Sequence, residues 1–266
     1  MNNKLGVIFL LPLIVCSALI GFFFEDGFGR ANVEYILSPP STLFWLGTDS
    51  LGRDLLIRIL FGAQTTFIVA LFGALGIISV GLLIGTATIF MPRTVETIFL
   101  RVLDVVDGMP NIITVSAVAL LIAQLTPASV GDYRVLGIII ITLTLTQWPN
   151  VARIVRSKLK VLYKEEYILA SKSIGASTVW IIRKHLWPAI GNLLWVLFLI
   201  QLPQTIFLET FLSFVGLGIE SPATSWGVLI YEGWKTLSYA PHLILAPAGF
   251  LFVTILCINQ MREMKA

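Results

Sequence analysis

Few residues in this chain have the type and spacing that covalent chemistry would require. Asp104 and Asp107 stand three residues apart, so a helix would place both carboxylates on one face, as in an acid and base pair. Arg93 and Arg101 lie close by in the sequence and would neutralise such carboxylates. We therefore interpret Asp104 and Asp107 as ion-pairing groups.

The sequence also lacks the motifs of common catalytic and nucleotide-binding sites. It contains no Gly-x-x-x-x-Gly-Lys-Ser/Thr phosphate loop, no His-Glu-x-x-His and no Gly-x-Ser-x-Gly. The only histidines are His185 and His242, and the only cysteines are Cys16 and Cys257, so no cluster of metal ligands is visible. We expect this chain to bind no metal or other cofactor and to catalyse no reaction itself.

The composition is that of a polytopic membrane protein. Hydrophobic residues make up 57% of the 266, charged residues 12%, and the mean hydropathy is +0.90. About 20 apolar residues in a helix cross the hydrocarbon core, and six uncharged runs of that kind occur. Their residues are 5–24, a run within 59–92, another within 107–132, then 135–152, 188–208 and a run within 236–261. Because they are continuous and do not alternate, an all-α fold of six membrane helices is predicted.

The distribution of basic residues predicts which side of the membrane each loop occupies. Lys and Arg favour the cytoplasmic side, and six spans place both termini on one side. With the termini inside, thirteen of the 18 lysines and arginines are cytoplasmic. We therefore expect cytoplasmic termini and a first span that is retained rather than cleaved as a signal peptide.

An external segment, residues 25–62, follows the first span. Asp54 and Arg58 have helical i,i+4 spacing, and Thr48 or Asp49 suits a helix N-cap. Together with apolar residues beside them, this spacing predicts a short amphipathic helix in the membrane interface with an architectural role. The remaining residues, 63–266, would hold the other five spans.

Between the fourth and fifth runs, residues 153–187 form a long basic loop. Tyr167, Ala170, Ser171 and Ile174 would share one helical face, and a second apolar face resumes after Gly175. Two short helices that meet at a glycine are therefore predicted, with Gly175 turning the chain through a positive φ. Any long loop at a membrane surface is basic and amphipathic, so composition alone does not distinguish a docking loop from an ordinary surface loop.

The sequence of this loop resembles the EAA loop of binding-protein-dependent ABC importer permeases. Residues 166–175 read Glu-Tyr-Ile-Leu-Ala-Ser-Lys-Ser-Ile-Gly, the family's pattern of Glu, two small residues and Gly. In that family the loop forms a coupling helix that docks on a cytoplasmic ATPase. The resemblance assigns this coupling role to Glu166, Ala170, Ser171, Gly175, His185 and Pro188.

Other blocks extend the resemblance to the subfamily that imports oligopeptides, dipeptides and nickel. Leu46-Gly-Thr-Asp-Ser-Leu-Gly-Arg-Asp54 is similar to its C-type permease signature, and Glu209-Thr-Phe-Leu-Ser-Phe and Trp226-Gly227 follow in the right order. The chain departs from the pattern with Ser171 where Ala is usual, Ala189 where Asn is common, and a shorter C-terminal ending. The fold implied is the type I ABC importer permease fold.

The resemblance also implies the remaining parts of the transporter. These are a second, homologous permease subunit, two cytoplasmic ATPase subunits that use ATP and Mg, and an external solute-binding protein, all at a bacterial inner membrane. Peptides are the first expectation for the solute, and nickel or another chelated metal is the alternative. A secondary transporter or an intramembrane enzyme would need polar groups deep in the membrane, where only Glu209, near the outer end of the fifth run, stands out. No nucleic-acid partner is expected.

Overall fold

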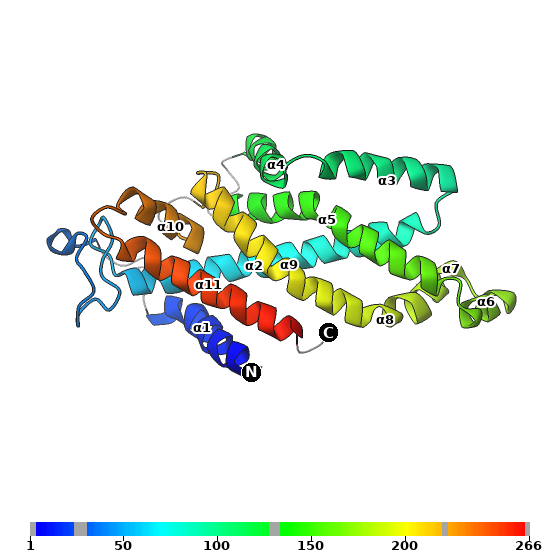
Figure 1. The fold of residues 1–266 in the computed structure, drawn as a ribbon, viewed down its shortest axis with the longest axis horizontal. Coiled ribbons are helices and arrows are strands. Elements are labelled where there is room, and N and C mark those ends of the chain that lie inside the picture. The colour runs from blue at the N-terminus through cyan, green and yellow to red at the C-terminus, as the bar shows by residue number, and fades with distance from the viewer. Residues whose placement is uncertain (1–3, 24–30, 128–133, 220–222, 264–266) are drawn as a thin grey trace.

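The computed structural model describes residues 4–23, 31–127, 134–219 and 223–263, and its regular structure within these ranges is helical. The long helices run roughly along the length of the molecule (Figure 1). One end carries residues 31–54 and helix α10 (Trp226–Lys235), and the opposite end carries the short helices α6 (Glu166–Ser173) and α7 (Thr178–Ile181). The molecule thus has two ends of different construction.

Four helices among the described residues are long and apolar enough to cross a membrane. They are α2 (Leu55–Thr88), α5 (Arg134–Leu162), α9 (Gly191–Phe214) and α11 (His242–Glu263). Helices α3 (Arg93–Asp107) and α4 (Asn111–Leu125) meet at a bend of 95° and would add a fifth span if they act together. Helix α1 (Lys4–Phe23) contributes a shorter apolar stretch, Leu10–Ile20. The helical membrane fold is confirmed, and the count of six spans stays a prediction.

Close packing of α2 against α5 forms the centre of the core. A Cβ atom on Gly81 would lie 2.5 Å from Val151 Cγ1, and one on Gly85 would lie 2.7 Å from the Ala152 carbonyl oxygen. Small residues permit such an approach in lipid, where packing rather than the hydrophobic effect holds helices together. Gly81 and Gly85 therefore allow α2 to pack closely on α5.

Helix α5 is longer than the sequence predicted. The apolar run was expected to end at Ala152, but the helix continues to Leu162 because Val155 and Leu159 are fully buried beside its charged residues. The fifth span was expected near Pro188, and α9 instead begins at Gly191 after the short helix α8 (Trp187–Ala189). The extension of α5 carries the loop between α5 and α9 away from the apolar part of the bundle.

The separate interfacial helix expected within residues 25–62 is wrong for the described part of that segment. Residues 48–54 form a turn closed by an isolated bridge between Thr48 and Asp54, and only a 3₁₀ turn, Val33–Tyr35, precedes it. Asp54 itself caps α2, accepting hydrogen bonds from the Leu56 and Ile57 amides. The i,i+4 spacing of Asp54 and Arg58 reflected the start of the long helix. The boundary at residue 24 lies outside the described residues.

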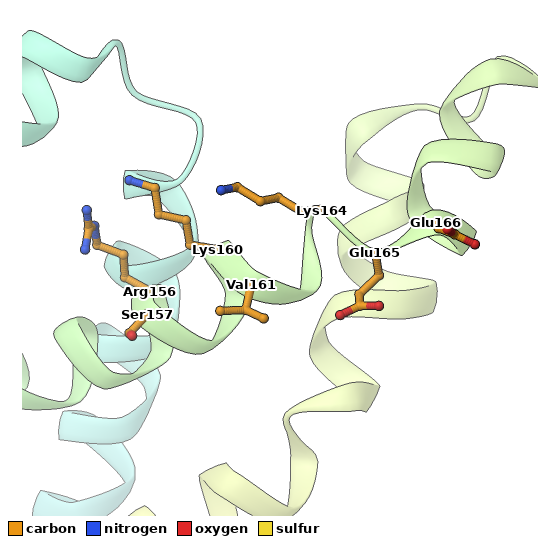
Figure 2. Close-up of a pocket in the computed structure, with 7 residues that line it drawn as sticks. All are labelled: Arg156, Ser157, Lys160, Val161, Lys164, Glu165 and Glu166. Carbon is orange, nitrogen blue, oxygen red and sulfur yellow. The ribbon is translucent and has the colours of Figure 1, made fainter.

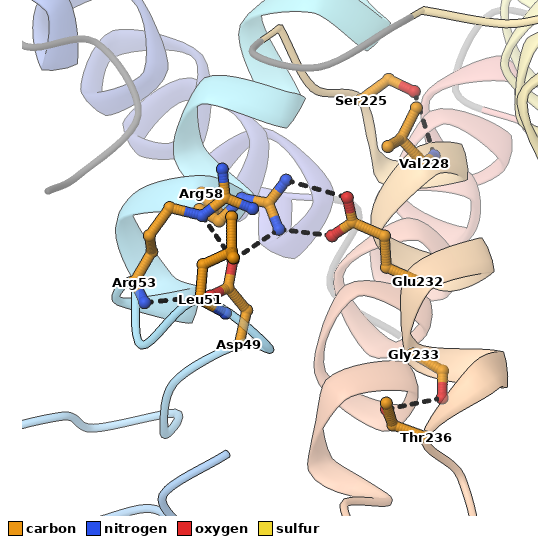
Figure 3. A network of polar contacts seen from close by, with 9 residues as sticks. All are labelled: Asp49, Leu51, Arg53, Arg58, Ser225, Val228, Glu232, Gly233 and Thr236. Atoms are coloured by element: carbon orange, nitrogen blue, oxygen red, sulfur yellow. Dashed lines mark hydrogen bonds and ion pairs between the residues drawn. The ribbon is translucent and has the colours of Figure 1, made fainter. Parts of the chain in front are cut away.

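A buried ionic cluster holds this outer turn to α10 (Figure 3). Asp49 Oδ2 accepts hydrogen bonds from Arg53 Nε at 2.7 Å and from Arg58 Nη1 at 2.8 Å. Arg58, only 1% exposed, also pairs with Glu232 of α10, with 2.5 Å between Nη1 and Oε2. Removing one partner of such a pair leaves a buried charge, which typically costs about 3–5 kcal/mol. The architectural role expected for the segment is thus performed by this cluster.

Candidate functional site: the loop between α5 and α9

The short helix α6 ends in a Schellman motif centred on Gly175. Gly175 has φ +89°, its amide donates to the Lys172 carbonyl at 2.9 Å, and the Ala176 amide donates to the Ser171 carbonyl at 3.0 Å. Glycine adopts this left-handed conformation without the penalty that a Cβ imposes. Ser177 then caps α7 by accepting a hydrogen bond from the Trp180 amide. The predicted turn at Gly175 between two short helices is confirmed.

One buried residue fixes α6 to the body of the protein. Ile168 is fully buried in the same apolar cluster as Leu159 of α5 and Ile181 and Leu186 of the following segment. Ser171 is also buried, and its hydroxyl donates to the Tyr167 carbonyl one turn earlier. The predicted face is divided: Tyr167, Ala170 and Ile174 are exposed, whereas Ser171, predicted on the same face, is buried with Ile168. The loop is therefore a packed element with a free outer surface.

That outer surface is apolar. Ile174 is 84% exposed, and four other large hydrophobic side chains of α6 and α7 are also exposed. We call this set the docking tip: Tyr167, Leu169, Ile174, Val179 and Trp180. Several large apolar side chains left exposed on a packed element are a candidate contact surface for another protein.

His185 lies in a π-helical segment, Ile182–Leu186, that the sequence did not predict. Its ring makes edge-to-face contacts with Tyr167 of α6, centroids 5.6 Å apart, and with Trp180 of α7, 5.0 Å apart. Its Nε2 atom is buried and has no hydrogen-bond partner among the described residues. The geometry makes His185 a positioning residue between the two short helices. Pro188 stands in α8, three residues before α9 begins.

An open depression of about 500 Å³ lies at the base of α6 (Figure 2). Arg156, Lys160 and Lys164 point to one side of it, and Glu165 and Glu166 stand at its far end. Arg156 Nε and Lys160 Nζ both bind the Glu96 carboxylate of α3, at 2.7 and 2.9 Å. This shared ion pair ties α3 to the end of α5 and stiffens the base of the loop.

Glu166, the first residue of α6, is exposed. Among the described residues its carboxylate makes no hydrogen bond or ion pair. A carboxylate is favoured at a helix N-terminus by the helix dipole, and this one is free to meet a cation from outside.

The other polar residues singled out from the sequence have structural partners. Asp104 is ion-paired, as predicted, but Oδ1 binds Arg153 Nη2 at 3.1 Å and not one of the neighbouring arginines named from the sequence. The side chain of Asp107 lies outside the described part. Glu209 is fully buried; its Oε1 accepts a hydrogen bond from the Ser213 hydroxyl at 2.8 Å, whereas its Oε2 has no hydrogen-bond partner among the described residues. Within the described ranges, no three His, Cys, Asp or Glu side chains gather where a metal ion could be held.

Comparison with known proteins settles the family. Residues 77–262 match the family described as "Binding-protein-dependent transport system inner membrane component". The match covers well over half of the chain. This chain belongs to that family. It is accordingly a transmembrane permease subunit of an ABC importer, as the EAA resemblance implied.

Several characterised permeases are similar over almost the whole chain. The dipeptide transport system permease protein DppC of Bacillus subtilis is 36% identical over 98% of this chain and 80% of its own length. The oligopeptide permease proteins OppC of Bacillus subtilis and Salmonella typhimurium are each 33% identical, covering 98% and 96% of this chain and 84% and 82% of their own lengths.

The fold resembles that of a solved ABC transporter. A chain of the MetNI methionine ABC transporter, in an inward-facing conformation, superposes with a TM-score of 0.58 over 80% of this chain and 96% of that one. At 19% identity, this likeness establishes the type I permease fold alone. The six coupling residues assigned from the sequence stay predictions about contact with a partner.

Proposed function

We propose that this permease subunit passes peptides across a bacterial inner membrane, driven by ATPase subunits that dock on the loop between α5 and α9. The observation that carries the docking claim is the exposed apolar docking tip held on two short helices by the buried Ile168 and the turn at Gly175. Peptides, rather than chelated nickel, are favoured because the similar permeases are named for oligopeptides and dipeptides.

The loop would transmit movement as a rigid body. Ile168, Ile181 and Leu186 belong to one buried cluster with residues of α5 and α9, so displacement of the docking tip displaces both spans. In this mechanism ATP and Mg bind to two partner ATPases, and their closure draws the docking tip inward. The attached spans then tilt and expose the pathway to the opposite side.

The remaining assembly follows from the same proposal. A second, homologous permease would complete the pore, and an external binding protein would deliver the solute to the end that carries α10. Both termini would be cytoplasmic, which fits the direction of the helices: α1 begins and α11 ends on the side facing α6 (Figure 1).

Substitution within the docking tip tests the proposal. Ile174→Asp places a charge where we expect an apolar contact, and burial of such a side chain contributes about 1.5–3 kcal/mol. We expect at least a tenfold loss of ATPase co-purification with the complex, since about 1.4 kcal/mol corresponds to a factor of ten, and a parallel loss of peptide uptake.

Val33→Asp is the matched control, because Val33 is 80% exposed but lies at the other end of the molecule. It should leave ATPase co-purification unchanged. Normal retention of the ATPase by Ile174→Asp would overturn the docking site, and a wild-type complex that imports no peptide would overturn the substrate.

A further inference from the structure

A cavity of about 420 Å³ opens between α4, α5, α9 and α11. Four of its lining residues carry side-chain amides: Asn111 from α4, Gln147 and Asn150 from α5, and Gln204 from α9. The other lining residues are apolar, among them Phe207 and Leu208. The cavity is therefore polar without being charged.

The cavity lies at membrane depth. At 1.5 Å per residue, Gln204 is about 20 Å from the start of α9 and about 15 Å from its end, close to the middle of that span. Asn150 is one turn before Arg153, toward the end of α5 that carries the loop. The amides thus extend from the centre of the bilayer toward the inner side.

Two of the amides are paired and two are free. Gln147 is 7% exposed, and its Nε2 donates to Asn111 Oδ1 at 2.9 Å, which links α5 to α4. Asn150 and Gln204 are exposed, and among the described residues their side chains make no hydrogen bond. Unpaired amides that faced lipid would be costly, because the hydrocarbon core offers no hydrogen-bond partner.

Both helices contain a proline at this level. Pro149 lies between Gln147 and Asn150, and Pro203 precedes Gln204. Each proline removes one backbone hydrogen bond and leaves a carbonyl one turn earlier without its usual donor. Proline is tolerated in a membrane helix where neighbouring helices, polar side chains or water satisfy the freed backbone groups, as beside an amide-lined cavity.

We propose that this amide-lined cavity is part of the translocation path and that Asn150 and Gln204 bind the main chain of the passing peptide. This inference rests on the proposed function and adds a site within the permease itself. An amide offers both a donor and an acceptor, which matches the alternating N–H and C=O groups of a peptide backbone. The lining carries no charged side chain, so the site would accept peptides of varied sequence.

Charge substitution at Gln204 tests this directly. Uptake of two otherwise identical short peptides, one with a lysine and one with a glutamate, is measured with the assembled transporter. We expect Gln204→Glu to favour the lysine peptide and Gln204→Lys to favour the glutamate peptide, each several-fold relative to wild type. Gln204→Leu should slow both peptides about threefold to tenfold, the factor carried by one hydrogen bond. Unchanged preference in both charged variants, with normal assembly, would overturn the proposal.

Thiol labelling separates a water-filled path from a surface covered by the second permease. In a Cys16→Ser, Cys257→Ser background, Gln204→Cys should react with a hydrophilic thiol reagent, and added peptide should slow the reaction. Leu145→Cys is the control, because Leu145 is an exposed apolar residue on a different face of α5 and should stay unlabelled. Complete protection of Gln204→Cys in every transport state would assign this face to the subunit interface and overturn the path.

Failure of the site can be told apart from failure of the proposed function. If the wild-type complex imports peptides and the Gln204 variants show wild-type peptide uptake, the site is wrong and the proposed function stands.

Discussion

Gly175 shows how one residue sets the geometry of the docking tip. Its φ of +89° closes the Schellman motif, yet a Cβ added there would meet no other atom within 4 Å. Gly175→Leu is therefore strained by backbone conformation alone, by about 1–2 kcal/mol. Because relief of that strain moves α6, we expect several-fold weaker ATPase retention and slower uptake, measured by co-purification and transport in membrane vesicles.

Gly216 provides a control with the same local structure. It has φ +86°, ends α9 in an equivalent pair of hydrogen bonds, and also has open space around its Cα. Gly216→Leu imposes the same strain at the end of α9 that lies far from α6 and should leave ATPase retention unchanged. Equal loss in both variants would mean that general destabilisation, not the position of the docking tip, explains the effect.

Residue-level prediction from the sequence succeeded where the cause was local. The turn at Gly175 depends on residues within one helical turn. Ion pairing of Asp104 was predicted from neighbouring arginines, but its partner, Arg153, lies 49 residues away. The partner of Arg58 could not be predicted, because Glu232 lies 174 residues away. The side-chain amides of the cavity gave a weaker signal in the sequence. Asn and Gln inside apolar runs need hydrogen-bond partners or water, which could have predicted a polar cavity there.

At the scale of elements, apolar runs predicted most helices because a span must satisfy its own backbone hydrogen bonds in lipid. Their ends were less predictable. Helix α5 continues ten residues past the run because Val155 and Leu159 find buried partners in other helices. The π-helix around His185 and the turn at residues 48–54 likewise depend on tertiary contacts, and the sequence favoured regular helix at both.

The packing of α2 on α5 predicts that glycine-to-alanine substitution destabilises the complex at one position and not at another. Gly81→Ala places a Cβ 2.5 Å from Val151 and should destabilise the complex by about 1–3 kcal/mol, as overpacking does. Gly137→Ala, on α5, meets nothing within 4 Å and should be neutral or stabilise by up to about 1 kcal/mol through helix propensity. Thermal unfolding of the purified transporter measures both. Equal stability of the two variants would mean that α2 and α5 are not in close contact.

For the whole molecule, the two ends have different chemistry. The outer turn is fixed by the buried cluster of Asp49, Arg58 and Glu232, whereas the opposite end presents the apolar docking tip above a basic depression. Paired charge satisfied within the chain suits a scaffold. Apolar surface left open suits a partner, and the long helices between the two ends connect them mechanically.

This arrangement predicts that the ends lie on opposite sides of the membrane. In a chain without Cys16 and Cys257, Ile174→Cys should react with a membrane-impermeant thiol reagent only in inside-out vesicles. Val33→Cys should react only from outside intact cells, because the positive-inside rule places the basic loop in the cytoplasm. Both side chains are highly exposed, so access rather than burial decides the result. Reaction of both from the same side would mean that an even number of spans lies between them, as would follow if α3 and α4 form a re-entrant pair and only α2 and α5 cross the membrane.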